Sequence, residues 1–178
     1  MNIPEPPIRP LETPRLVLEP QVAAHADEMF VVLSDPAIYE FENAPPASAE
    51  ALRERYRALE SRRSSDGTQL WLNWTVRLKS GRAAIGYVQA TVLPDATALV
   101  AYEFNSAWWG RGLAREAVAA AMRELSQHLG VTRLGAVFKT ENERSRRLLV
   151  RLGMCPAASG EFPSGLVEAG ESAMAMVL

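Results

Sequence analysis

The chain has 178 residues, of which 48% are hydrophobic and 22% are charged. This length and this balance are typical of one soluble globular domain with a substantial core. The formal net charge of −2 argues against nucleic acid as the main partner, because phosphate backbones bind to strongly basic faces. A single cysteine excludes an intrachain disulfide and favours a reducing compartment. The sequence has no apolar run of membrane-spanning length and no signal-peptide pattern, so we expect a cytoplasmic protein without a membrane partner.

The first third of the chain is predicted to hold an arm, one strand and two helices. Residues 1–10 contain four prolines and are expected to form an extended arm. Alternating apolar side chains predict a strand in residues 15–20, and helical spacing predicts a helix in residues 22–34. Ser48 is a favourable N-cap residue, so the second helix is expected to begin directly after it.

The middle of the chain changes to the period of two that is typical of strands. Three alternating segments, residues 70–79, 83–93 and 98–104, are separated by short turns with the sequences KSGR and PDAT. Short connections of this kind predict an antiparallel meander.

The last third alternates between helix and strand. We predict a helix in residues 113–130, a strand in residues 132–139 and a helix in residues 141–153. Thr140 and Glu143 have capping-box spacing at the start of the last helix. The stretches MCPA and SAMAMVL supply two further strands. The layout predicts an α+β domain, with one mixed sheet and helices on its faces.

The stretch AWWGRGLAREAV, residues 107–118, places two glycines at the start of a predicted helix, where glycine is a poor helix former. Gly110 and Gly112 would let an anion approach backbone amides at the positive end of the helix, with Arg111 and Arg115 nearby. The spacing fits neither a P-loop nor a dinucleotide fingerprint. The stretch therefore predicts a phosphate or pyrophosphate site, and the alternative is an ordinary glycine cap.

The longer stretch YEFNSAWWGRGLAREAV resembles the acetyl-coenzyme A motif of the GNAT N-acetyltransferase superfamily, Gln/Arg-x-x-Gly-x-Gly/Ala. Gly112 and Ala114 fill the last two positions. Trp109 stands at the first position, as in the Rim-like branch that acetylates N-termini of ribosomal proteins. LETPRLVLEP and KTENERSRRLLVRLGM resemble the opening strand and the last helix of the same branch, with Asn142 and Ser145 in register.

The resemblance implies a GNAT fold over residues 11–178, a single domain. Its central sheet would have about six to seven strands, mostly antiparallel and splayed, with helices on both faces. It further implies acetyl-CoA as the acetyl donor, no metal, a primary amine as the acceptor, and a homodimer as in many relatives. The residues expected to bind the coenzyme by this resemblance are Phe104, Asn105, Trp109, Gly110, Arg111, Gly112, Leu113, Ala114, Arg115, Asn142 and Ser145.

Two residues are candidates for the chemistry of acetyl transfer. Ser145 matches a family serine near the thioester sulfur and could protonate the leaving thiolate; the alternative is a first-turn helix residue without a chemical role. The glutamate that serves some members as the base is replaced by Leu99, so Glu103, the only acid on that strand, is the candidate here. Aromatic neighbours disfavour a charged carboxylate, which suits a base. A water chain, or one of three acids in residues 159–172 (Glu161, Glu168 and Glu171), is the alternative.

The acceptor is expected to bind between the first two helices, with the loop that joins them, and the late loop of residues 159–172. Tyr39, Phe41 and Trp74 are aromatic candidates to line its site, while Glu40 and Glu42 could attract a cationic amine. Three functions remain open. The first is acetylation of a protein or peptide N-terminus, and the second is acetylation of a small-molecule amine such as a polyamine, an aminoglycoside or an amino-acid-like compound. The third is a weakly catalytic CoA-binding regulatory module.

Overall fold

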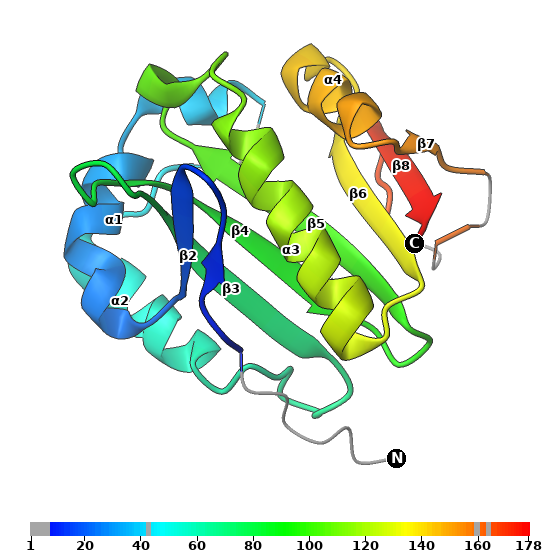
Figure 1. Cartoon of the computed structure of the whole chain (residues 1–178), viewed down its shortest axis with the longest axis horizontal. Coiled ribbons are helices and arrows are strands. Elements are labelled where there is room, and N and C mark those ends of the chain that lie inside the picture. Colours follow the sequence, from blue (N-terminus) through cyan, green and yellow to red (C-terminus); the bar gives the residue numbers. More distant parts are fainter. Residues whose placement is uncertain (1–7, 42–43, 159–160, 163–164) are drawn as a thin grey trace.

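The computed structural model describes residues 8–41, 44–158, 161–162 and 165–178. In this part of the chain eight strands form one mixed sheet in the order β1-β2-β3-β4-β5-β6-β8-β7 (Figure 1). The strands are β1 (Leu11–Glu12), β2 (Leu16–Pro20), β3 (Leu70–Leu78), β4 (Ala84–Val92), β5 (Thr97–Phe104), β6 (Arg133–Lys139), β7 (Cys155–Pro156) and β8 (Glu171–Val177). The helices are α1 (Ala26–Leu33), α2 (Ala49–Leu59), α3 (Leu113–Leu129) and α4 (Glu143–Arg151), with short 3₁₀ turns η1 (Ala23–His25), η2 (Pro36–Glu40) and η3 (Ser106–Trp108).

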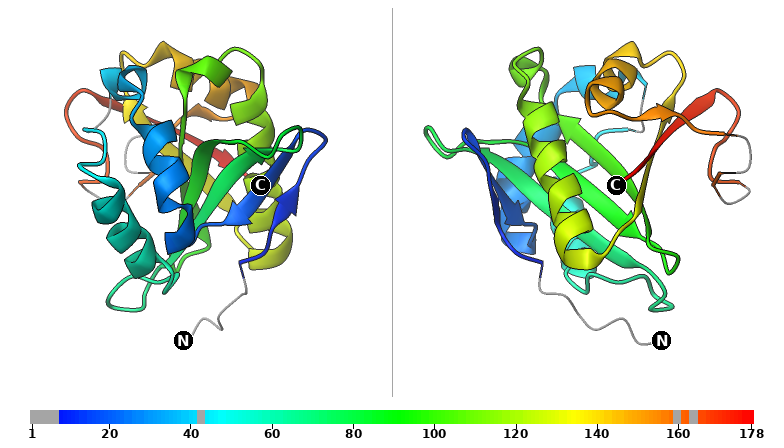
Figure 2. Two further views of the ribbon diagram at one scale, coloured as in Figure 1. Left: turned by 90° about the vertical axis from the view of Figure 1, so that its left-hand side faces the viewer. Right: turned by 45° about the vertical axis from the view of Figure 1, so that its right-hand side comes forward.

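Helices cover both faces of the sheet (Figure 2). The long helix α3 crosses one face, with α4 beside it, and buries the main core cluster against β2 to β6. The helices α1 and α2 pack on the opposite face around a second cluster that includes Met29, Leu52 and Tyr56. Among the described residues no helix combines the length and apolarity that crossing a membrane requires.

The sheet is antiparallel except at one pair of strands. The strands β5 and β6 run parallel and pair only where Thr97–Leu99 lie beside Arg133–Gly135. Beyond that point β6 continues along β8, with Arg133 to Lys139 all in register, while β5 continues along β4 to Phe104. Because the two strands separate after Leu99, the sheet opens into a V whose arms are the ends of β5 and β6.

The expected α+β fold with a splayed sheet is confirmed, and two details differ. The strand number is eight rather than six to seven, because β1 is a two-residue strand, too short to show a periodicity. Ser48 caps α2 as predicted, accepting a hydrogen bond from the Ala51 amide at 3.0 Å. The cap of α4 is Asn142 instead of Thr140, because the Asn142 side chain accepts from the Ser145 amide at 3.0 Å.

The predicted N-terminal arm is only partly described, since residues 1–7 lie outside the described residues. Arg9 is tied to the domain: its guanidinium donates to the buried carboxylate of Glu124 at 2.7 and 2.9 Å. The end of the arm therefore packs against α3, although its proline content predicts an extended segment with few contacts.

Candidate active site

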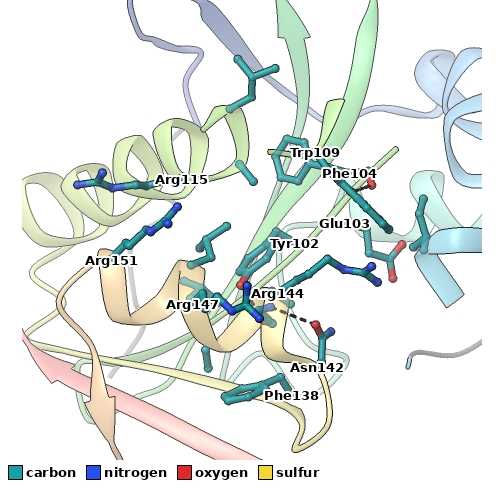
Figure 3. A pocket seen from close by; sticks show the side chains of 18 of the residues that line it. Tyr102, Glu103, Phe104, Trp109, Arg115, Phe138, Asn142, Arg144, Arg147 and Arg151 are labelled. Atoms are coloured by element: carbon teal, nitrogen blue, oxygen red, sulfur yellow. Dashed lines mark hydrogen bonds between the residues drawn. The ribbon is translucent and has the colours of Figure 1, made fainter. Parts of the chain in front are cut away.

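A cavity of about 510 Å³ fills the V between β5 and β6. Its walls are the end of β5, the turn before α3, the middle of β6 and one face of α4 (Figure 3). It reaches from Arg115 and Arg151 on the α3 side to Ile38 and Tyr87 on the α1 side. The cavity therefore passes along the edge of β5 from one face of the sheet to the other.

The turn before α3 is shaped by two left-handed glycines. Gly110 has φ 72° and Gly112 has φ 73°, a region that glycine enters without the steric cost other residues pay. Gly112 is the N-cap of α3 and makes no side-chain capping bond, so the first amides of the helix have no intrahelical partner. Arg15 fastens the turn from outside, donating to the Arg111 carbonyl oxygen at 3.0 Å and pairing with Glu116 at 2.7 Å. The result is a fixed set of N–H donors at the positive end of a 17-residue helix.

Three arginines line the same end of the cavity. Arg115 comes from the first turn of α3, and Arg147 and Arg151 come from one face of α4 (Figure 3). Together with the helix terminus they make this end strongly cationic. Such an end suits a ligand with several phosphate charges.

Two tryptophans hold the glycine turn in place. The Trp109 indole nitrogen donates to the carbonyl oxygen of Phe104 at 2.7 Å, which ties the turn to the last residue of β5. Trp108 packs against the main core, and the Arg111 guanidinium lies 4.9 Å above the centre of its ring. The bulky pair in front of the glycines therefore fixes where α3 begins.

Neighbouring residues of β5 point to opposite faces of the sheet. The Tyr102 hydroxyl lies 2.8 Å from the hydroxyl of Ser145 on α4. Glu103 faces the other way, toward α1 and α2, and both residues line the cavity. The Tyr102–Ser145 pair can therefore act as an acid from one face of β5, while Glu103 can act as a base from the other face.

Three tyrosines lie near enough to Glu103 for its charge to affect their pKa values. Burial, followed by the negative charge of Glu103, raises the pKa of Tyr87 well above its usual value, and a hydrogen bond with that carboxylate acts in the same direction. The same two causes, burial first, raise the pKa of Tyr39 to about 12. Tyr56 is shifted upward as well, mainly by burial. These phenols stay neutral and protonated in the range where enzymes work.

Most of the residues predicted to bind the coenzyme lie together. Those that line the cavity are Phe104, Trp109, Gly110, Gly112, Leu113, Ala114, Arg115, Asn142 and Ser145. Two do not line it. Asn105 caps η3, accepting from the Ala107 amide at 3.1 Å, and donates to the Val32 carbonyl at 3.2 Å. Arg111 turns its side chain onto Trp108.

The predictions for the acceptor side fare less well. The prediction for Trp74 is wrong: its side chain is 0% exposed on the α3 face of β3 and donates to the Arg9 carbonyl at 3.0 Å. Tyr39 lies close to the cavity without lining it, and its hydroxyl donates to the Leu33 carbonyl at 2.7 Å. The Phe41 ring lies 5.8 Å from the guanidinium of Arg144, which does line the cavity. Glu42 lies outside the described residues.

The alternative acids of the late segment have other partners. Glu161 accepts from the Ala158 amide at 2.7 Å, and Glu171 pairs with Lys139 at 2.7 Å. Neither these two nor Glu168 lines the cavity. Glu103 is the carboxylate that the structure brings to it.

Sequence reasoning missed the arginine face of α4. Arg144, Arg147 and Arg151 are spaced i, i+3 and i+7, so they share one face of a helix, and Leu148 lies between them. That spacing was a readable signal. Tyr102 was missed as well, because its partner Ser145 is 43 residues away in the chain.

Comparison with known proteins identifies the class of the chain. It belongs to the acetyltransferase (GNAT) domain family, whose model matches residues 15–155. A curated relative, the uncharacterized N-acetyltransferase YoaA of Bacillus subtilis, is 26% identical over 148 residues, covering 80% of this chain and 81% of that protein. Membership confirms the expected N-acetyltransferase class and the acetyl-CoA donor that the sequence resemblance implied.

Solved structures share the fold at low identity. RimL, a ribosomal L7/L12 α-N-protein acetyltransferase solved with coenzyme A, superposes with a TM-score of 0.78 at 14% identity, over 95% of this chain and 98% of that one. The ribosomal-protein-S5-alanine acetyltransferase of Vibrio fischeri gives 0.76 at 18% identity, over 94% and 96%. The microcin C7 self-immunity acetyltransferase MccE, solved with acetyl-CoA and AMP, gives 0.73 at 15%, over 93% and 94%. These similarities confirm the fold and leave the acceptor of this chain open.

Proposed function

We propose that this chain transfers the acetyl group of acetyl-CoA to the α-amino group of a protein or peptide N-terminus. One observation carries the proposal: a single cavity joins the glycine turn of α3, the Tyr102–Ser145 pair and the Glu103 carboxylate. These are the three parts that acetyl transfer to an amine needs, namely a donor site, an acid and a base.

The donor side fits coenzyme A on structural grounds. A Cβ added at Gly110 would meet nothing within 4 Å, so the turn is open toward the cavity and its amides can be reached by a pyrophosphate. The ladder between β5 and β6 ends at Leu99 in the described chain, which leaves the β6 side of Val100 to Phe104 open to an extended amide-containing arm. Arg115, Arg147 and Arg151 would hold the remaining phosphate charge.

When bound, acetyl-CoA supplies an activated acetyl thioester. Glu103 accepts the proton that the acceptor nitrogen loses as its bond to the acetyl carbon forms. The neutral phenol of Tyr87 donates a hydrogen bond to Glu103 and so helps to keep that carboxylate in place.

The departing sulfur takes a proton on the opposite side of β5. The Ser145 hydroxyl would give its proton to the thiolate sulfur as the carbon–sulfur bond breaks, while the Tyr102 hydroxyl, 2.8 Å away, passes its own proton to the Ser145 oxygen and regains one from solvent. The amide of Ser145 is fixed by Asn142 at 3.0 Å, so α4 presents this hydroxyl from a capped, ordered first turn. Because Tyr102 and Glu103 are adjacent, one strand sets the spacing between acid and base.

Two observations support a polypeptide acceptor. The RimL and S5-alanine enzymes, with which this chain shares its fold, carry ribosomal-protein acetylation in their descriptions. At the acceptor end of the described chain a cation, Arg144, lines the cavity together with Glu103, whereas a site for a polycationic amine favours carboxylates alone.

The test measures free-thiol release from acetyl-CoA with peptides that start with Ala, Ser or Met, and with spermidine and an aminoglycoside as small-molecule acceptors. The wild type is expected to turn over at least one peptide, with mass spectrometry placing the acetyl group on its α-nitrogen. Ser145→Ala is expected to lower kcat about tenfold or more while the affinity for CoA stays within twofold. Turnover confined to the small amines would contradict the peptide acceptor, and CoA binding without any turnover would favour the regulatory module.

A further inference from the structure

Arg144 is the one arginine of the described cavity wall that leaves the cationic donor end. It begins on the α4 face that carries Arg147 and Arg151, but Figure 3 shows its side chain reaching across the cavity toward Trp109 and Glu103. Its guanidinium therefore lies on the acceptor side of β5, against Trp109 and Glu40.

Three contacts from two segments of the chain hold this guanidinium. It stacks on the Trp109 ring with 4.0 Å between its central carbon and the ring centre. One amino group donates to the Glu40 carboxylate of η2 at 2.9 Å, and the Phe41 ring lies 5.8 Å away. The side chain of Arg144 is half exposed, so the group is positioned by neighbours and is still open to solvent and ligand. Because the Trp109 ring covers one face of the planar guanidinium, the N–H groups along its edge that do not contact Glu40 can still donate to a ligand.

The position of the Arg144 guanidinium restricts which amines can enter the cavity. Because Arg144 and Glu103 line the same cavity, an acceptor nitrogen that reaches Glu103 brings its substituents into the space that Arg144 faces. A second positive charge there would be repelled by the guanidinium stacked on Trp109, although solvent weakens this repulsion because the side chain is half exposed. An oxygen acceptor at the same place would gain a charge-assisted hydrogen bond.

We infer that Arg144 determines acceptor specificity: its guanidinium donates to the carbonyl oxygen next to the acceptor amine, and so selects α-amino groups of peptides and disfavours polyamines. This inference rests on the proposed function, since it needs acetyl transfer at the same site. It adds the feature that the enzyme recognises, which is the carbonyl oxygen two bonds from the carbon that bears the amine.

The experiment compares three acceptors with full-length protein: an Ala-starting peptide amide, isopropylamine and spermidine. Isopropylamine is the first residue of that peptide with its carbonyl group replaced by a methyl group. Each variant is compared with the wild type for each amine separately, so the different basicities of the amines cancel. Arg144→Gln is expected to lower kcat/KM for the peptide about tenfold to hundredfold, mainly through KM. For isopropylamine the change should stay within threefold, and for spermidine kcat/KM should rise.

Two further variants separate charge, geometry and general damage. Arg144→Lys keeps the charge and loses the fork, so it should still disfavour spermidine and recover only part of the peptide activity. Arg146→Gln removes a neighbouring arginine that pairs with Glu143 at 2.8 Å and does not line the cavity, so it should match the wild type. The affinity for CoA, measured by calorimetry, should stay within twofold in all three variants.

The outcomes distinguish the inference from the function beneath it. An equal loss for the peptide and isopropylamine in Arg144→Gln would show that the guanidinium only supports the Trp109 turn, and would overturn the inference. A wild type that prefers spermidine would overturn it too, while leaving an acetyltransferase in place. A wild type that binds CoA but acetylates none of the three amines would contradict the proposed function and the inference together.

Discussion

The two ends of the cavity are built in different ways. The donor end uses backbone amides, two left-handed glycines and arginines, and the residues that shape it lie in two short segments, the α3 turn and α4. The acceptor end uses side chains from four elements, including Ile38 of η2, Tyr87 of β4 and Glu103 of β5. A contiguous motif can specify the donor end on its own, whereas the acceptor end exists only after the sheet and its helices have assembled. Changes at the donor end should therefore affect coenzyme affinity, and changes at the acceptor end should affect turnover.

The largest effect is expected at the acceptor end, from Glu103→Gln. Removing the base should lower kcat by about hundredfold or more, with CoA affinity within twofold of the wild type. Steady-state kinetics and calorimetry on the same preparation test both statements. Glu161→Gln removes the alternative acid of the late segment and should leave kcat unchanged. A large loss in Glu161→Gln with none in Glu103→Gln would place the base outside β5.

At the donor end, Gly112→Ala should weaken CoA binding by about tenfold with a smaller change in the KM for the acceptor. A Cβ at φ 73° strains the turn by about 1 kcal/mol and shifts the amides that face the cavity. Gly67→Ala is the matched control, because Gly67 has φ 71° with nothing within 4 Å of an added Cβ and does not line the cavity. Both variants should lose similar free energy of unfolding. If both also kept full CoA affinity, the glycine turn would not be the phosphate site.

A smaller effect is expected from the arginine face of α4. Arg151→Gln should lower CoA affinity about threefold to tenfold and make its salt dependence shallower, because one cation fewer faces the phosphates. Isothermal titration at two salt concentrations measures this. Arg123→Gln, two turns further along α3 than Arg115 and outside the cavity wall, is expected to behave as the wild type. Identical salt dependence in both variants would remove Arg151 from the donor site.

The smallest effect is expected at Asp35, which joins η2 to η3. Asp35 caps η2, accepting from the Ala37 amide at 3.0 Å and from the Ser106 amide of η3 at 2.6 Å. Hydrogen bonds from Ser106 hold the pKa of Asp35 below its ordinary value of 3.8. Its stabilisation is therefore fully present above about pH 4 and is lost as the pH falls through the lower, folded-state pKa.

Asp35→Ala should cost about 1 kcal/mol of unfolding free energy at pH 7, as loss of an N-cap does. Asp35→Asn keeps an oxygen acceptor and should cost less at pH 7, and its stability should fall less than that of the wild type between pH 5 and pH 3. Urea unfolding at the three pH values measures both. A parallel decline in wild type and Asp35→Asn would show that this carboxylate contributes nothing to the acid sensitivity.

The difference between the two ends also explains what the sequence could predict. Gly110, Gly112 and Asn142 belong to local motifs whose conformation follows from neighbours in the chain, so their place in the cavity wall was predictable. The strand pattern of β3 was equally readable, but alternation does not say which face meets which helix. Trp74 was therefore assigned to the acceptor, although it lies under α3.

The rest depends on contacts between distant residues. Tyr102 meets Ser145 only because α4 folds back over the diverged strands, and Arg144 meets Glu40 across 104 residues of chain. Neither contact produces a repeating pattern in the sequence that could have predicted it. Asn105 shows that closeness in sequence is not enough either. It lies next to the glycine motif in the chain, but its side chain turns away from the cavity to cap η3.

The central claim is that one cavity holds the donor on one side of β5 and a peptide amine on the other. The most direct measurement is the affinity of a conjugate in which the sulfur of CoA is joined through an acetyl linker to the α-nitrogen of an Ala-starting peptide. The account predicts binding about hundredfold tighter than CoA alone, because one molecule fills both sides. The same peptide joined through its C-terminus should bind like CoA. Equal affinity of both conjugates and of CoA would contradict the account.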